Sequence, residues 1–281
     1  MTITLPKLIK LYFLSELLQK IKEEKLTTIT FNWINVENIA DETIGFYLSF
    51  LSFLEQNKIN LVCENEKKCA CYQRISDIQH CNILEITNGC KDIYVASVKT
   101  LEAQEQLRMQ MKDFFRSCIN VGNKDIQPID TIFSELFMNI CQHSANKNGF
   151  VFMPFLSNTN SITLIMNDLG DGVVNIIRNY FIDETFNIDA NVIRYAMENF
   201  VTTKSTESNQ GRGLNILKTL MIRIKGDLQV YLEKGLYEIS KGKEILSDLS
   251  YKHIGTLIKV NILIENLPQK EEDDFSQDID F

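Results

Sequence analysis

The chain has 281 residues, of which 44% are hydrophobic and 23% are charged, a composition typical of a globular protein with room for two domains. Its formal net charge of −8 argues against a general binder of nucleic acid or anionic membranes, because phosphate contacts need patches of lysine and arginine. No apolar run approaches the roughly twenty residues that a membrane span needs, and the first residues lack a signal-peptide pattern. We therefore expect a cytoplasmic protein without membrane contacts.

The first 95 residues predict a small α/β unit. Apolar periodicity alternates along it between helix and strand, with helices expected at 8–21, 41–54 and 68–75 and strands at 27–34 and 59–63. This alternation favours a parallel or mixed sheet with helices packed on it. Cys69-Ala70-Cys71 is closer than the usual two-residue spacing of zinc ligands, so we expect reduced thiols here.

The stretch from Ile34 to Asp41, followed by a helix, resembles the STAS domain of anti-sigma-factor antagonists. Those antagonists carry a phosphorylatable serine or threonine at the start of that helix, whereas this chain reads Ala40-Asp41-Glu42-Thr43. Asp41 as a plain helix cap is the interpretation that we favour. The alternatives are that the acidic pair mimics a phosphorylated residue, or that the unit is a docking surface and never a substrate.

We place a domain boundary after residue 95, because the chain changes character there and Asn88-Gly89 indicates a turn. Residues 101–119 then predict a long helix, where a sensor kinase would carry its phosphoacceptor histidine. The three histidines of the chain are His80, His143 and His253. None lies in this helix, so a self-phosphorylating histidine kinase is a poor interpretation.

Residues 133–144 predict a helix with two different faces. Glu135, Asn139 and His143 recur every four positions and form a polar stripe. The neighbouring stripe is apolar and can seat the helix on a sheet; it consists of Ile132, Leu136 and Ile140. A carboxylate one turn before an amide is an unusual choice for packing alone, which indicates a functional helix. For His143, packing and ligand contact remain equally open.

Two glycine turns follow this helix. The first, Asp168-Leu169-Gly170-Asp171-Gly172, comes after a hairpin predicted from strands at 149–156 and 161–167, with its turn at 158–160. The second, Gly211-Arg212-Gly213-Leu214, starts a helix and ends the polar stretch 201–213. A stretch of this length without secondary structure is usually a functional lid.

The remaining elements complete one sheet with helices. We expect helices at 173–181 and 190–200 and strands at 227–231, 236–239 and 256–264. Residues 268–281 form an acidic tail, which we expect to be disordered and solubilising.

Four of these stretches resemble, in order, the E-L-x-x-N helix, the D-x-G-x-G turn, the G-x-G-L lid end and the closing G-T strand of GHKL ATPases. This superfamily includes gyrase, the 90-kDa heat-shock chaperones, MutL-type repair proteins, sensor histidine kinases and anti-sigma-factor kinases. The opening of the lid, Phe200-Val201-Thr202-Thr203-Lys204, is similar to the F-x-T-T-K of the two kinase groups. The resemblance implies a GHKL domain over residues 96–267: an α/β sandwich of a mixed sheet covered by helices on one face.

The resemblance also implies roles for single residues, with ATP and Mg²⁺ as cofactors. Asp168 accepts a hydrogen bond from the exocyclic amine of adenine, Asn139 is the protein ligand of Mg²⁺, and Glu135 is the general base. The amides near Gly211 and Gly213 hold phosphates at a helix start, and Lys204 or Arg212 neutralises the γ-phosphate. The wider cofactor-binding set is completed by His143, Gly170, Gly172, Thr203, Leu214 and Thr256.

Three functions compete for such a chain. The first is a serine/threonine kinase that acts on an antagonist-like protein partner, as the anti-sigma-factor kinases do. The second is a slow ATPase switch whose lid controls a partner, with a homodimer as an option. The third is a non-catalytic scaffold with ATP as a structural ligand. We expect an Mg-ATP-binding regulatory protein and leave kinase and switch open, since a fold does not decide a function.

Overall fold

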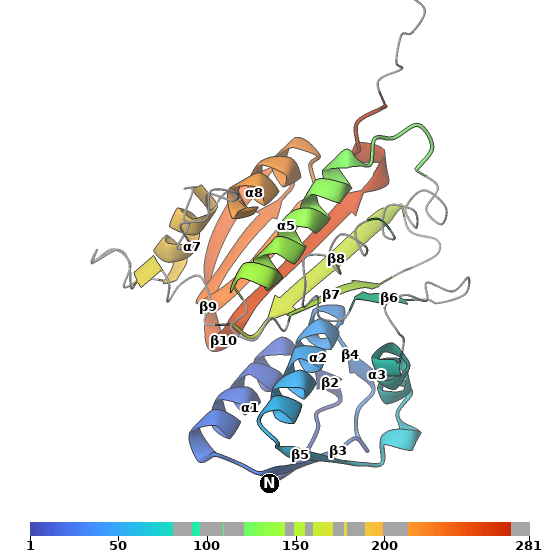
Figure 1. Ribbon diagram of the computed structural model, residues 1–281, viewed down its shortest axis with the longest axis vertical. Coiled ribbons are helices and arrows are strands. Elements are labelled where there is room, and N and C mark those ends of the chain that lie inside the picture. Colours follow the sequence, from blue (N-terminus) through green and yellow to red (C-terminus); the bar gives the residue numbers. More distant parts are fainter. Residues whose placement is uncertain are drawn as a thin grey trace, which may run out of the picture.

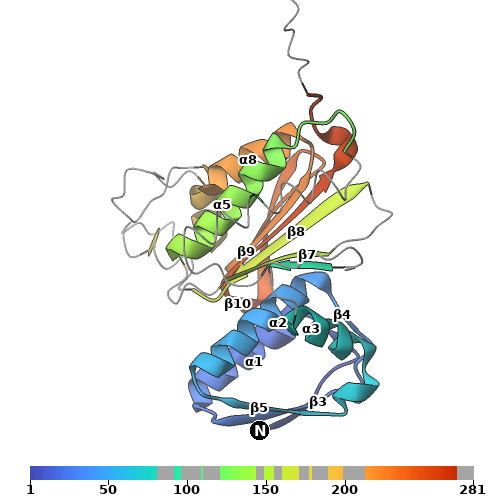
Figure 2. The ribbon, with the colours of Figure 1, turned by 45° about the vertical axis from the view of Figure 1, so that its right-hand side comes forward.

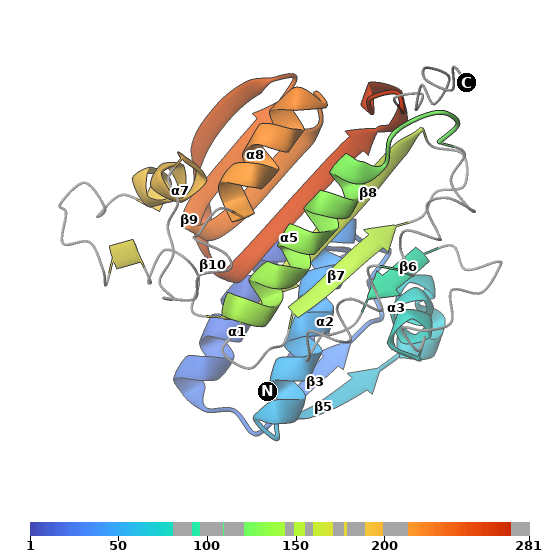
Figure 3. The ribbon, with the colours of Figure 1, turned by 45° about the horizontal axis from the view of Figure 1, so that its top comes forward.

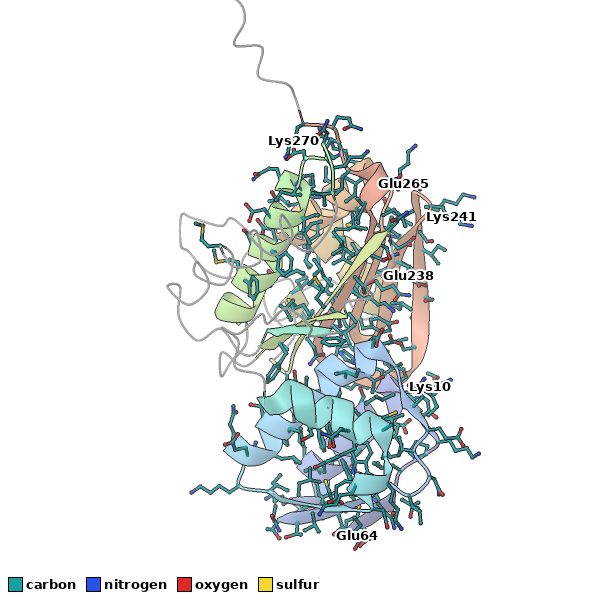
Figure 4. The ribbon with its side chains drawn as sticks, turned by 90° about the vertical axis from the view of Figure 1, so that its right-hand side faces the viewer. Lys10, Glu64, Glu238, Lys241, Glu265 and Lys270 are labelled. Carbon is teal, nitrogen blue, oxygen red and sulfur yellow. The ribbon has the colours of Figure 1, made fainter. Side chains whose placement is uncertain are left out.

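The computed structural model describes residues 1–80, 92–95, 109, 121–143, 149–154, 160–170, 177–178, 189–198 and 213–270. In these residues the chain is an α/β protein, as expected, with a three-stranded, a five-stranded and a two-stranded sheet. The molecule is elongated, and helices lie between the two larger sheets and above the upper one (Figure 1). Glu64 and Lys270 lie near its opposite ends (Figure 4).

Helices and strands alternate in the N-terminal part, as predicted. The first sheet has the order β1-β3-β5 and is parallel; its strands are β1 (Thr2–Thr4), β3 (Thr28–Asn32) and β5 (Asn60–Glu64). A short parallel pair consists of β2 (Leu8–Ile9) and β4 (Asn38–Ile39). The helices are α1 (Leu11–Glu24), α2 (Asp41–Gln56), the 3-10 turn η1 (Glu66–Lys68) and α3 (Ala70–His80).

Two details of this part differ from the prediction. The helix expected from Leu8 begins at Leu11, because Leu8 and Ile9 are extended and pair with β4. The N-cap residue of α2 is Ala40, while Asp41 and Glu42 occupy the first turn. The capping role predicted for Asp41 is therefore wrong, although carboxylates in a first turn interact favourably with the helix dipole.

The second sheet has the order β6-β7-β8-β10-β9. Its strands are β6 (Asp92–Val95), β7 (Gly149–Pro154), β8 (Ser161–Asp168), β9 (Asp227–Ser240) and β10 (Lys243–Leu263). Every pairing among these described strands is antiparallel, so the expectation of a mixed sheet is wrong for them. The two-residue connection between β9 and β10 explains one of these pairings, because strands joined by a tight turn run antiparallel.

The β9–β10 hairpin is longer than predicted. β9 is continuous where two strands were expected, and β10 starts at Lys243 rather than near Thr256. Lys241 and Gly242 form the turn, with φ of 51° and 71°, the left-handed pair that a two-residue hairpin requires. A lysine rarely adopts this conformation, which is why the sequence did not indicate a turn here.

Three helices cover one face of the second sheet (Figures 1 and 3): α5 (Gln127–His143), α7 (Asp189–Glu198) and α8 (Gly213–Arg223). A 3-10 turn, η3 (Ile264–Asn266), follows β10. None of the described helices is long and apolar enough to span a membrane. The helices predicted at 101–119 and 173–181, apart from residues 109 and 177–178, lie outside the described residues, as do most of the turn at 158–160 and the lid up to residue 212.

The opposite face of the second sheet is covered by α1 and α2 (Figure 2). Side chains alternate between the faces of a strand, so Val151 and Met153 belong to the core beneath α5, whereas Phe152 packs with the N-terminal helices. Ile165 on β8 and Leu257 on β10 also join that second core. The expectation of a sheet covered on one face is thus corrected: helices cover both faces.

The N-terminal part and the second sheet therefore share one hydrophobic core. Moreover, β6 pairs with β7, so the second sheet begins before the boundary that we expected after residue 95. At the other end, Pro268 and Lys270 form backbone hydrogen bonds with Asp125 and Asn123. The first residues of the predicted tail are thus paired, and residues 271–281 lie outside the described part of the chain.

Candidate functional site

Helix α5 carries the predicted polar stripe. The Asp125 carboxylate accepts a hydrogen bond from the Gln127 backbone N–H at 2.9 Å, which satisfies one free donor of the first turn. Ile132 and Leu136 are fully buried in the core beneath the helix, as the apolar stripe predicts. This packing leaves Glu135 and Asn139 only partly buried, on a neighbouring face of the helix.

The start of α8 lies directly against this polar stripe. A Cβ atom at Gly213 would be 2.9 Å from Oε2 of Glu135 and 3.3 Å from Oδ1 of Asn139. A glycine at the first position of α8 therefore permits a close approach, because a Cβ atom here would displace the Glu135 carboxylate. Glu135, Asn139 and Gly213, which were predicted separately from two motifs, are brought together.

Both α5 side chains at this contact have unusual surroundings. Burial raises the pKa of Glu135 above its ordinary value, the direction that suits a general base. The amide nitrogen of Asn139 is buried and has no hydrogen-bond partner among the described residues. Buried polar groups in native proteins are rarely left unsatisfied, so this N–H group is a natural donor to an oxygen of a ligand.

Asp168 closes strand β8 and is only 2% exposed. Its Oδ1 accepts a hydrogen bond from the Gly170 backbone N–H at 2.7 Å, and the Thr256 side chain forms a second hydrogen bond with the carboxylate. Thr256 is also the register partner of Asp168 on β10. Burial raises the pKa of Asp168 to about 6, although both hydrogen bonds oppose that shift.

Gly255 fixes the turn after Asp168 from the neighbouring strand. Its φ is +82°, and a Cβ atom there would overlap the Asp168 carbonyl oxygen and lie 2.8 Å from Cα of Leu169. Only glycine fits this combination of left-handed backbone and close approach. The sequence predicted a strand only from residue 256, whereas Gly255 lies inside a longer one.

Two groups of site residues lie at the same end of the second sheet: Glu135 and Asn139 with Gly213, and Asp168 with Gly255 and Thr256. α5 ends at His143, and β7 then starts at Gly149, which pairs with Asp168. α8 leads into the start of β9 at the opposite end of the sheet, where Asp227 pairs with Asn261. The first residue of α8 therefore lies at the Asp168 end, beside the last turns of α5 (Figure 3).

A scan of protein-family models finds none that matches this chain, and a search of curated proteins finds no match either. The chemistry of the site has to be inferred from its own residues.

Those residues fit an Mg-ATP molecule in three respects. Asp168 is a buried acceptor at a strand end, Asn139 offers an unsatisfied side-chain N–H donor for a phosphate oxygen, and Gly213 opens the N-terminus of an eleven-residue helix, where phosphates bind well. Within the described residues no group of three or more His, Cys, Asp or Glu side chains could hold a metal ion. A magnesium ion here would need oxygens from the nucleotide and water beside the Asn139 amide, which is its usual preference.

Asn215 is a residue that the sequence analysis missed. Its side-chain amide donates hydrogen bonds to the carbonyls of Met197 at 3.0 Å and Glu198 at 3.4 Å. These bonds hold the start of α8 against the end of α7, the two described elements that flank the predicted lid. Its position directly after the Gly213-Leu214 pair is the one signal that could have indicated this role.

The other predicted site residues cannot be placed in the same way. Leu214 packs against the core beneath α5 and α8. The side chain of His143 lies outside the described part of the structure. So do five whole residues: Gly172, Thr203, Lys204, Gly211 and Arg212. Their roles in cofactor binding stay predictions.

Proposed function

We propose that this chain is an ATP-dependent regulatory protein of the GHKL type, which binds Mg-ATP where α5, α8 and β8 meet. The observation that carries the proposal is the contact of Gly213 with both Glu135 and Asn139. It joins the helix motif to the glycine motif in space, although the motifs are far apart in the sequence. An unrelated α/β protein with accidental glycine turns has no reason to bring them together.

The described residues would divide the work as follows. Bound Mg-ATP supplies an activated phosphoryl group whose charge the metal neutralises. Asp168, in its ionised form, accepts a hydrogen bond from the adenine amine, and guanine has a carbonyl at that position. Asn139 contributes an amide oxygen, and the backbone N–H groups at the start of α8 donate to phosphate oxygens. Glu135 takes a proton from the attacking hydroxyl or water.

We propose further that the N-terminal part is a STAS-like docking unit and that the chain controls a protein partner. Support comes from the parallel first sheet and from α2, which begins directly after Ala40. Thr43, the only hydroxyl near the expected phosphorylation position, is fully buried. Glu42 bonds to Lys259 on β10 at 3.2 Å, so this helix start faces the second sheet. These contacts argue against a phosphorylation substrate.

The decisive experiment compares substitutions at the two polar positions of α5. Glu135→Ala removes the base but no phosphate or adenine contact, so it should keep ATP affinity and lower turnover by roughly 10²–10⁴-fold. Asn139→Ala removes the metal's protein ligand and should instead weaken Mg-ATP binding. Calorimetry gives the affinities, and release or transfer of labelled γ-phosphate gives turnover. Glu55→Ala, an exposed change on α2, is the control and should alter neither quantity.

The fate of the label separates kinase from switch. Label on a serine or threonine of a partner, in a mixture with native partner proteins, indicates a kinase, while label released only as inorganic phosphate indicates an ATPase switch. Equal turnover by wild type and Glu135→Ala would contradict both and leave ATP as a structural ligand. Absence of ATP binding by the wild type would refute the site itself.

A further inference from the structure

The face of the second sheet turned away from α5 and α8 is joined to the N-terminal helices by polar contacts as well as by the shared core. The side-chain amide of Asn167 on β8 donates a hydrogen bond to Oγ of Ser49 on α2 at 2.7 Å. The Ser49 hydroxyl in turn lies 3.4 Å from the Gly45 carbonyl oxygen. Both Ser49 and Asn167 are fully buried, so the hydrogen bond is shielded from water and from exchange with it.

Gly45 explains how α2 comes so close to the strands. A Cβ atom at this position would lie 3.7 Å from Cγ2 of Ile165 and 3.9 Å from Cβ of Phe152, which is van der Waals contact with β8 and β7. The small residue thus brings the helix backbone near the sheet and places Ser49, one turn further on, within reach of Asn167. The hydrogen bond follows from the packing of these elements.

Two further polar contacts join the same surfaces. His253 on β10 is fully buried, with Nδ1 3.4 Å from Oγ of Ser15 on α1 and its ring 5.3 Å from that of Phe46. Lys259, also on β10, bonds to Glu42 on α2. The polar contacts between the N-terminal helices and the sheet thus fall on β8 and β10, the strands that also carry Asp168 and Thr256.

Asn167 and Asp168 are neighbours whose side chains belong to opposite faces of β8. Successive residues of a strand point to opposite sides, so Asn167 reaches α2 while Asp168 bonds to the Gly170 N–H and to Thr256. One peptide unit therefore separates the anchor of the N-terminal helices from the residue that we assign to adenine. A displacement of the β8 backbone at this point would move both side chains.

We infer that the N-terminal part regulates the nucleotide site directly, through the Ser49–Asn167 hydrogen bond, and that α1 and α2 sense nucleotide binding by the same route. This inference rests on the proposed ATP site. Ser49 and Asn167 are positioning residues: they hold the end of β8, and with it Asp168, in the geometry that binds ATP. Such pre-organisation increases the affinity for ATP. Because coupling between two sites is reciprocal, bound nucleotide must in turn tighten the contact between α2 and β8.

The test is Ser49→Ala in the full chain. It removes the hydrogen-bond acceptor and should weaken ATP binding, measured by calorimetry, by about fivefold or more, the lower end of typical coupling between sites. Hydrogen exchange of the α1 and α2 amides supplies a second readout. In the wild type, saturating Mg-ATP should slow exchange in both helices, although they lie on the far side of the sheet; in Ser49→Ala this effect should disappear.

Two matched variants separate positioning from simple stability. Ser52→Ala changes a serine one turn further along α2, where its hydroxyl accepts a hydrogen bond from Gln56, and should leave ATP affinity unchanged. Ser49→Ala combined with Asn167→Leu replaces both polar partners by apolar groups, which can restore stability. It should recover the melting temperature of the wild type but not its ATP affinity.

Each outcome has a distinct meaning. If the wild type does not bind ATP, the proposed function fails and the coupling with it. If the wild type binds ATP but Ser49→Ala binds it equally well or more tightly, the coupling alone is refuted. Recovery of ATP affinity by the double variant would also refute it, because affinity would then follow overall stability.

Discussion

Burial controls the chemistry of Asp168. The carboxylate is almost inaccessible to water, and its pKa rises from 3.8 to about 6, because a buried charge loses its hydration. The folded pKa exceeds the unfolded one, so this residue stabilises the fold at low pH and loses that contribution as the pH rises through about 6. The proposed adenine contact needs the ionised form, which gives folding and ATP binding opposite pH dependences at this position.

Affinity for ATP should therefore fall as the pH falls through about 6. Only about a tenth of the carboxyl is ionised one unit below its pKa, which predicts roughly tenfold weaker binding at pH 5 than at pH 7. Asp168→Asn should abolish most of the affinity at every pH. One atom of the amide would accept from the Gly170 N–H, and the other would then present a donor to the donor on adenine.

Calorimetry of wild type and variant over this pH range measures both effects. Asp227→Asn is a suitable control, because Asp227 begins β9 at the opposite end of the same sheet, where it accepts a hydrogen bond from Ser240. It should bind ATP as the wild type does. Equal affinity of Asp168→Asn and wild type would refute the assignment of Asp168.

At the scale of single elements, the position of α8 depends on Gly213, because this residue has no side chain. Gly213 is the first residue of the helix, and no left-handed φ is found there, so alanine fits its backbone. The added Cβ would nevertheless lie 2.9 Å from the Glu135 carboxylate. Since that carboxylate ends a flexible side chain, it can move aside. We therefore expect the substitution to affect turnover more than the free energy of unfolding.

Gly213→Ala should thus lower turnover about tenfold or more, part of the general-base effect, while the free energy of unfolding stays equal or rises, because alanine favours a helix. Steady-state kinetics and thermal unfolding provide the two measurements. Gly242→Ala should behave in the opposite way: its φ is +71° with nothing within 4 Å, so alanine is strained by roughly 1–2 kcal/mol but touches no site residue. A loss of stability in Gly213→Ala without loss of turnover would contradict the arrangement.

At the scale of the whole molecule, the chain has four layers: the first sheet, α1 and α2, the second sheet, and α5 with α7 and α8 (Figures 1 and 2). The second layer, α1 and α2, packs against both sheets. Leu14 and Phe46, from the two helices, belong to the same core as Phe31 below them and Phe152 above them. The N-terminal part is therefore structurally required by the second sheet.

Removal of residues 1–80 should prevent the remainder from folding as a stable monomer. The deletion would expose Phe152, Ile165 and Leu257 together with the buried polar groups of Asn167 and His253. Loss of buried apolar area and of hydrogen-bond partners both lower the free energy of unfolding. Circular dichroism with thermal unfolding should show no cooperative transition for the fragment 81–281.

Supply of residues 1–80 as a separate chain is the control for that deletion. The two fragments should associate and recover a cooperative transition, because the residues that pack between them form one hydrophobic core. If fragment 81–281 unfolded cooperatively by itself at the temperature of the intact chain, the shared core would contribute little, and the two parts would be independent domains.

The sequence by itself determined the local elements and the candidate residues. Apolar periodicity placed α2, β3, β5 and the β7–β8 hairpin within a few residues, and it placed the end of α5 but not its start, which is Gln127 rather than Phe133. Burial on one face leaves such a direct pattern in the chain. The spacing of Glu135 and Asn139, and the glycines at 170 and 213, indicated a site before any contact was known. These features depend on neighbours within a turn or two.

Only the tertiary structure decided what covers the back of the second sheet. The side chains on this face are apolar or aromatic whichever helix packs on them; they include Phe152, Ile165, Leu257 and Tyr231. Their pattern therefore does not predict which element covers them. The contacts of Asn167 with Ser49, and of Gly213 with Glu135, join residues far apart in the sequence. Such pairs are fixed by the packing of whole elements, because a hydrogen bond or a close approach forms only after burial has brought the two surfaces together.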